Sequence, residues 1–128
     1  ATLGLPDKHN QDSGAYSADG VPIANTWQGV FPFFNTTEDL FAEASPVGCF
    51  PSDSNGVYDL IGNVWEWVDT PHSPLPKNLR PKKKRTYRIV KGGGWTSPLG
   101  FATINYRNVV AGDIKNPTFG FRCVKSIN

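Results

Sequence analysis

The sequence lacks the features that would point to a membrane or nucleic-acid protein. No apolar run is long enough to cross a bilayer, and no segment has the pattern of a signal peptide, so we expect any such segment to precede residue 1. The net charge of +2 is too small to indicate a polyanionic partner. The basic run Lys82–Arg85 has no interleaved aromatic residues, which favours a solvated loop. We therefore predict no membrane span and no nucleic-acid binding.

Cysteine is also scarce. Cys49 and Cys123 are the two cysteines of the chain, and neither belongs to a Cys-x-x-Cys pair of the kind that binds zinc. Two cysteines do not build a disulfide framework. They can pair with each other, pair with a thiol outside the chain or stay reduced, and their spacing weakly favours the last two arrangements.

Common catalytic motifs are missing as well. His9 and His72 lie in polar, turn-rich segments without metal-binding spacing, and no Gly-x-Ser-x-Gly nucleophile motif occurs. The glycines at 92–94 are not followed by the Lys-Ser or Lys-Thr of a phosphate-binding loop. The sequence therefore predicts no catalytic residue.

Glycine and proline, by contrast, are abundant. The chain has 13 glycines and 11 prolines among 128 residues, with 38% hydrophobic residues. This composition favours one domain, residues 1–128, with many turns, short elements and little helix. The local patterns predict irregular coil over 1–23, one or two helical turns over 37–44, strands over 64–68, 87–90, 103–110 and 118–124, and an exposed loop over 70–86.

The segment Asp59–Trp67 concentrates two tryptophans and two carboxylates in nine residues. The alternation around Trp65 and Trp67 predicts a short strand with both indoles on one face. We expect all four tryptophans of the chain to belong to the core, because large rings need burial. We also expect Arg122 to be buried against an acidic group, with Glu66 as the candidate partner.

Six motifs occur in a characteristic order. They are Ala24–Gly29 followed by Phe31-Pro32, Glu38-Asp39-x-Phe41, Pro46-Val47, Gly56–Trp67, Val90–Gly93 and Gly120–Cys123. Together they resemble the C-terminal half of the formylglycine-generating enzyme, or sulfatase-modifying factor, family. The resemblance covers residues 24–124.

The resemblance implies an α+β fold of the sulfatase-modifying-factor type, related to C-type lectins. Such a fold has little regular secondary structure and a small antiparallel sheet. The resemblance also implies that the chain is the C-terminal part of a larger domain. An N-terminal fragment or a second chain is then the expected partner that completes it.

Catalytic members of the family carry a cysteine pair that is understood to bind copper(I) and to oxidise a target cysteine to formylglycine with dioxygen. The two positions align with Ser97 and Ala102. Hydroxyl and methyl groups do not replace thiolate ligands of copper(I), so we expect neither copper nor the family's oxidase activity. The family's ligand groove would be lined by Trp95, Ser97, Ala102 and Arg107. The resemblance further implies that Cys123 pairs with a cysteine outside this chain.

The resemblance also implies two calcium sites, and calcium takes six to eight hard oxygen ligands. The first would use the side chains of Asn25 and Asp39 and the carbonyls of Thr26 and Phe41. The second would use the side chains of Asp59 and Glu66 and the carbonyls of Gly62 and Val64. The alternative is that Asp39, Asp59 and Glu66 are ordinary turn and surface acids. Calcium would serve stability here, because a cation can satisfy carbonyls that irregular backbone leaves unpaired.

The leading hypothesis is a calcium-binding, non-catalytic member of the family that binds a polypeptide or another ligand. By resemblance to catalytically silent relatives, it would belong to the secretory pathway or the extracellular space. One alternative is an oxidoreductase of the formylglycine-generating type that is completed by another chain or has altered chemistry. The other is a C-type-lectin-like ligand-display module, as in some bacterial and phage variable proteins.

Overall fold

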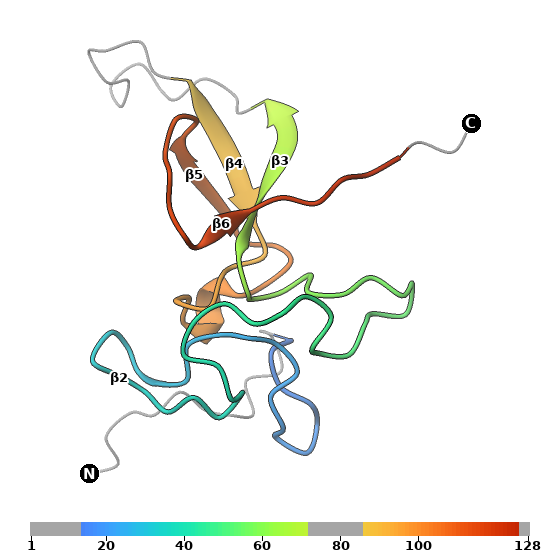
Figure 1. Ribbon diagram of the computed structural model, residues 1–128, viewed down its shortest axis with the longest axis vertical. Helices are drawn as coiled ribbons and strands as arrows, with labels where there is room; N and C mark the ends of the chain where they lie inside the picture. Colours follow the sequence, from blue (N-terminus) through green and yellow to red (C-terminus); the bar gives the residue numbers. More distant parts are fainter. Residues whose placement is uncertain (1–13, 72–85, 126–128) are drawn as a thin grey trace.

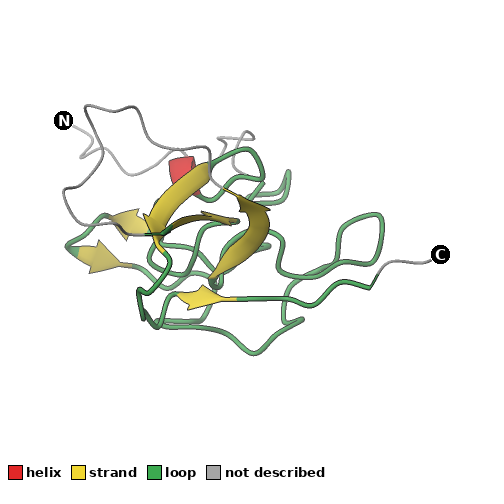
Figure 2. Cartoon of the chain, turned by 90° about the horizontal axis from the view of Figure 1, so that it is seen from above, coloured by secondary structure: helices red, strands yellow, loops and turns green. Residues whose placement is uncertain are grey.

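The structure is a computed structural model that describes residues 14–71 and 86–125 (Figure 1). Its strands are β1 (Gly29–Val30), β2 (Phe34–Asn35), β3 (Trp65–Pro71), β4 (Tyr87–Lys91), β5 (Arg107–Ala111) and β6 (Phe119–Gly120), and its one described helical turn, η3, is a 3₁₀ segment over Leu99–Phe101. Figure 2 shows that loops make up most of the molecule. The prediction of little regular structure is therefore confirmed.

Four strands form the main sheet, in the order β5-β4-β3-β6. The β3–β4 and β4–β5 pairs are antiparallel, as predicted, whereas β6 runs parallel to β3, with Trp65 opposite Phe119. Ile89 and Val90 of β4 are buried at the centre of this sheet. Two pairs of aromatic side chains pack at this sheet: Trp65 contacts Tyr106, and Trp67 contacts Phe119. The predicted strands at 64–68 and 87–90 therefore correspond to the two central strands of the sheet.

Residues 14–64 form an irregular half, drawn as blue to green coil below the sheet in Figure 1. Its regular structure is the two-stranded β1–β2 ribbon and one isolated bridge between Tyr16 and Pro22. Its apolar core is small: Ala15 and Ala24 pack with Leu99. Polar residues share the interior to an unusual degree, as the buried side chains of Asn25, Thr26, Gln28, Asp39, Ser45, Asn63 and Ser97 show.

Two predictions of local structure were wrong. Residues 37–44 form turns and not a helix, because Thr37 and Leu40 have φ angles of 51° and 74°, in the left-handed region. Only Phe119–Gly120 of the predicted strand 118–124 is a strand, and it ends before the exposed Phe121 and Val124. The strand predicted over 103–110 is present in its second half, as β5.

Several expectations concern residues outside the described ranges. These are His9, His72, the basic run Lys82–Arg85 and most of the predicted coil at the start of the chain. Within the described residues, no helix has the length and apolar character that a membrane crossing requires. Trp65 is buried, whereas the other three tryptophans are half-buried, so the core prediction holds fully for Trp65 alone.

Candidate metal centre

The Asp39 carboxylate holds two backbone segments together. Its Oδ2 accepts a hydrogen bond from the Thr26 N–H at 3.0 Å, and its Oδ1 accepts one from the Phe41 N–H at 3.0 Å. The Asp39 N–H in turn donates to Oε1 of Gln28 at 3.1 Å. These bonds explain the left-handed turn at Leu40 and bring three of the four residues of the first predicted calcium set into contact.

Asn25 supplies the fourth member, and its side chain is oriented by one strong contact. Its Nδ2 donates to the Glu43 carbonyl at 2.9 Å, which directs Oδ1 the opposite way. The Oδ1 atom is buried and has no hydrogen-bond donor among the described residues. A buried polar atom without a partner costs roughly 1–3 kcal/mol, so such atoms are rare unless a water or an ion binds them.

The carboxylates of this half of the domain also act on Tyr16. Burial raises the pKa of Tyr16 to about 12, and the carboxylates of Glu38 and Asp39 contribute to the shift because they disfavour a second negative charge. The described residues contain no cluster of three or more His, Cys, Asp or Glu side chains. A metal bound here would therefore depend on one carboxylate with amide and carbonyl oxygens, which is calcium-type chemistry. Both Asp39 oxygens already accept backbone N–H bonds, so the donor-free oxygen that this set offers such an ion is Oδ1 of Asn25.

The second predicted set begins at Asp59, in a tightly curled segment. Asp59, Gly62 and Asn63 have φ angles of 53°, 76° and 57°. The Asp59 Oδ2 accepts a hydrogen bond from the Gly48 N–H at 2.7 Å, and its Oδ1 is buried without a donor among the described residues. One oxygen of this set is therefore free for a ligand in the same way as the oxygen of Asn25.

Glu66 fits the second set less well, because it already has a cation. Arg122 binds both Glu66 oxygens, through Nε at 2.5 Å and through Nη2 in a still shorter contact. Its Nη1 and Nη2 also donate to the carbonyls of Tyr58 and Asp59. The predicted Arg122–Glu66 pair is confirmed, but its side chains are 33% and 23% exposed and not buried. The hydrogen bond to Glu66 raises the pKa of Arg122, so the guanidinium charge is permanent here and opposes a metal ion at Glu66.

The two sets meet at the carbonyl of Asn25. That oxygen accepts a hydrogen bond from the Asn63 N–H at 2.8 Å. Gly62 lies so close that an added Cβ would be 2.2 Å from the same oxygen. The Asn63 side chain continues the junction, since it exchanges two hydrogen bonds with the backbone of Ser45. The turn residues Gly62 and Asn63 therefore fix the position of the first set from the second.

Comparison with known proteins shows to which family the chain belongs. A family model described as the sulfatase-modifying factor enzyme 1-like domain matches residues 4–127. The chain belongs to the sulfatase-modifying factor family. The formylglycine-generating enzyme of Mus musculus is 36% identical over 115 residues, which cover 81% of this chain and 30% of that protein. The inactive C-alpha-formylglycine-generating enzyme 2 of the same organism is 35% identical over 80% of this chain and 32% of that protein.

Two further similarities extend the family's range. The chaperone protein LppX of Paenibacillus barcinonensis is 35% identical over 92% of this chain and 40% of that protein. Among solved structures, PvdO from Pseudomonas aeruginosa has a TM-score of 0.58 and 28% identity, over 77% of this chain and 37% of that one. The chain thus spans about a third of the length of the relatives it matches.

The four positions that were predicted to line a ligand groove are not equally accessible. Ser97 is buried, and its Oγ accepts a hydrogen bond from the Gly94 N–H at 2.9 Å. Ala102 is fully buried against Gly93. Trp95 is half-buried, and Arg107 is exposed at the start of β5. Ser97 and Ala102 can therefore form only the floor of a groove.

The two cysteines of the domain are both exposed and are not bonded to each other. Mutual pairing, one of the three arrangements that the sequence left open, is not present in the structure. The motif analysis also missed one cavity, which Leu60, Lys91 and Ile104 line from three distant parts of the sequence. Pairing the two predicted strands with each other could have indicated this cavity, because the register places Glu66 opposite Lys91.

Proposed function

We propose that this sulfatase-modifying factor domain is a calcium-stabilised, non-catalytic module that binds a polypeptide. The observation that carries the calcium proposal is the buried, donor-free Oδ1 of Asn25, whose neighbour in sequence, Thr26, is bonded to the Asp39 carboxylate. A bound cation would convert this unpaired oxygen into a ligand and would hold segments 25–26 and 39–41 together. Its role would be structural, because calcium binds the oxygen atoms of irregular backbone and has no redox chemistry.

The non-catalytic proposal rests on Ser97 and Ala102. The active and the inactive relatives are almost equally similar to this chain, at 36% and 35% identity, so overall similarity does not separate the two functions. The proposal is supported instead by the hydroxyl of Ser97 and the methyl group of Ala102, which stand where the resemblance implies the cysteine pair and which offer no soft ligand for copper(I). The described cysteines, Cys49 and Cys123, lie at other motifs and are exposed.

A polypeptide partner is supported by two observations. The chain covers about a third of its relatives' length, so a further polypeptide segment would complete a domain of their size. The relative from Paenibacillus barcinonensis is named a chaperone protein, a class that acts on polypeptides. The position of the domain in the secretory pathway or outside the cell remains part of this proposal and rests on the family resemblance.

Calcium binding is tested by the thermal stability of the metal-free protein during a calcium titration. We expect a rise in Tm, because a ligand present at 100 times its Kd stabilises a protein by about 2.7 kcal/mol. Asp39→Asn keeps the size of the side chain but replaces one of the two acceptor oxygens by an NH2 group and removes the charge, and should abolish most of the rise. Asp113→Asn, at an exposed turn, is the matched control and should leave it intact. Calcium that changes neither Tm nor bound-metal content would disprove the proposal.

Catalysis is tested by copper(I) titration and by oxygen consumption in the presence of a sulfatase peptide that contains the target cysteine. We expect no stoichiometric copper binding and no oxygen uptake above the buffer rate. Formylglycine formation by this chain, or by this chain with an added N-terminal partner, would instead support the oxidoreductase alternative.

A further inference from the structure

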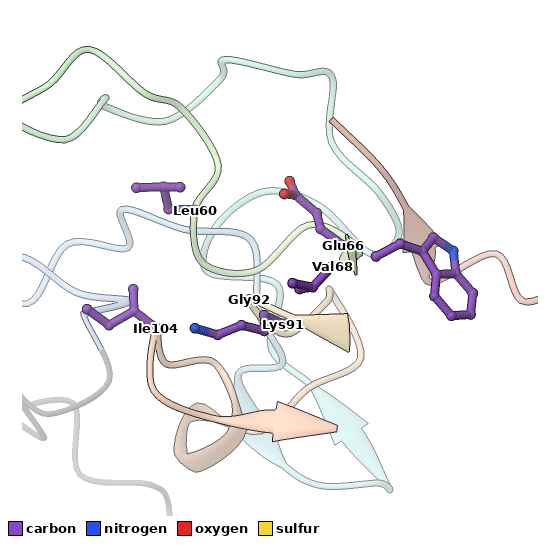
Figure 3. A pocket seen from close by; sticks show the side chains of 7 residues that line it. Leu60, Glu66, Val68, Lys91, Gly92 and Ile104 are labelled. Carbon is purple, nitrogen blue, oxygen red and sulfur yellow. The ribbon is translucent and has the colours of Figure 1, made fainter. Parts of the chain in front are cut away.

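A pocket of about 240 Å³ lies over the ends of β3 and β4, outside the candidate calcium sets except for Glu66. Leu60, Glu66, Trp67, Val68, Lys91, Gly92 and Ile104 line it. Figure 3 shows Leu60 and Ile104 on one side and Val68 on the other, with the ammonium of Lys91 extending across the floor toward Ile104. The pocket therefore combines apolar walls with one cationic end.

The charge of Lys91 is available to a ligand. Lys91 lies opposite Glu66 in the β3–β4 pair and opposite Arg107 in the β4–β5 pair. Within residues 14–71 and 86–125, however, the ion pair of Glu66 is with Arg122, and the Lys91 ammonium has no carboxylate within 4 Å. Both Glu66 oxygens are occupied by the guanidinium. The unmatched charge that faces this pocket is therefore positive.

The walls add an apolar requirement. Leu60 is 39% exposed and Ile104 is 57% exposed, so both leave apolar surface for a ligand to cover. Covering such surface is favourable by about 25 cal/mol per Å². Gly92 allows the backbone to pass close to the Leu60 carbonyl, since an added Cβ would lie 3.1 Å from that oxygen. The volume is below the range of about 300–1,000 Å³ for drug-sized ligands, so it suits a group the size of one amino acid.

We infer that this pocket binds a carboxylate attached to an apolar group of one side chain's size, with Lys91 pairing the carboxylate and Leu60 and Ile104 covering the apolar part. A free carboxylic acid and the C-terminal residue of a polypeptide share this chemistry. The inference goes beyond the proposed function and requires neither calcium nor the groove at 95–107, so failure of either proposal leaves it standing.

Binding is tested by calorimetry on the full chain with 4-methylpentanoate, and with acetylated peptides that end in leucine. We expect both the free acid and the peptide with a free C-terminus to bind. The corresponding amides should bind at least tenfold more weakly, because they cannot pair with the ammonium. A peptide that binds more tightly than the free acid identifies a polypeptide end as the preferred source, and the reverse order identifies a small metabolite-like acid.

Variants separate the pocket from general charge. Lys91→Met keeps the length of the side chain without its charge and should weaken binding at least tenfold, whereas Lys91→Arg should bind within about threefold of the original. Lys115→Met removes an equal charge at an exposed position away from the pocket and is the control. Near-UV circular dichroism confirms that each variant is folded. Equal affinity for acid and amide, unchanged affinity in Lys91→Met, or no binding to the original chain would overturn the inference.

Discussion

The sheet and the irregular half of this domain differ in how they pair their backbone polar groups and fill their interiors. In the sheet, the backbone groups pair along β3–β6, and apolar residues such as Ile89 and Val90 fill the interior. In residues 14–64, the interior contains side chains such as Asn25, Asp39 and Asn63, which bond the backbone directly. Apolar packing tolerates small changes in shape, whereas a network of directed bonds depends on each atom. The irregular half should therefore respond more sharply to substitution.

The largest effect is expected at the junction of the irregular half. Gly62→Ala would place a Cβ 2.2 Å from the Asn25 carbonyl oxygen in a backbone with φ of 76°. We expect a loss of about 3 kcal/mol or more in the free energy of unfolding, because strain and steric overlap add. Urea denaturation measures it. Gly56 has the same φ but nothing within 4 Å, so Gly56→Ala should cost only about 1–2 kcal/mol. Equal losses in the two variants would show that backbone conformation alone, and not the contact, determines the cost.

The second effect concerns the polar interior itself. Asn63→Ala removes both hydrogen bonds to Ser45 and leaves a buried N–H and a buried carbonyl unpaired. We expect a loss of about 2–3 kcal/mol in chemical denaturation. Asn63→Asp keeps the acceptor for the Ser45 N–H, and its protonated form can also donate to the Ser45 carbonyl, so it should recover part of this loss at acidic pH and less of it at neutral pH, where a charged oxygen faces that carbonyl. If the Asp variant were no more stable than the Ala variant even at acidic pH, the two bonds to Ser45 would not be the stabilising contacts.

The connection between the halves should matter less. Arg122→Ala breaks the pair with Glu66 on β3 and two bonds to the carbonyls of residues 58 and 59. Because the guanidinium is a third exposed, solvent replaces part of what is lost, and we expect about 1–2 kcal/mol. Arg122→Lys should restore charge but not the forked geometry. A loss that vanishes in high salt would identify the interaction as mainly Coulombic.

The smallest effect is expected within the sheet. Ile89→Val removes one methylene from a buried apolar position and should cost about 0.5–1.5 kcal/mol. Thermal unfolding followed by circular dichroism measures it against the original chain. A cost larger than that of Asn63→Ala would reverse the comparison and make apolar packing the more demanding interior.

The sequence predicted the parts of the fold that depend on local pattern. β3 follows from the alternation around its tryptophans, and β4 from a short segment rich in residues that favour strands. The expected pairing of Glu66 with Arg122 joins an acid and a base from two of the six motifs. The turns at 37–44 could not be predicted this way, because Asp39 is fixed by Thr26 and Gln28, which are distant in sequence. The parallel position of β6 and the pocket around Lys91 depend on how strands are arranged in space, which a linear pattern does not contain.

The bonds at Asn25 and Asn63 also have a consequence for the order of folding. Asn25 reaches Glu43 across 18 residues, and Asn63 reaches Ser45 across another 18. The segment between residues 25 and 63 is therefore tied at its middle to both of its ends. Closing a loop costs conformational entropy that grows with its length, so each short closure places the ends nearer to each other before they meet. The buried amides of this segment thus divide one long loop closure into two shorter ones.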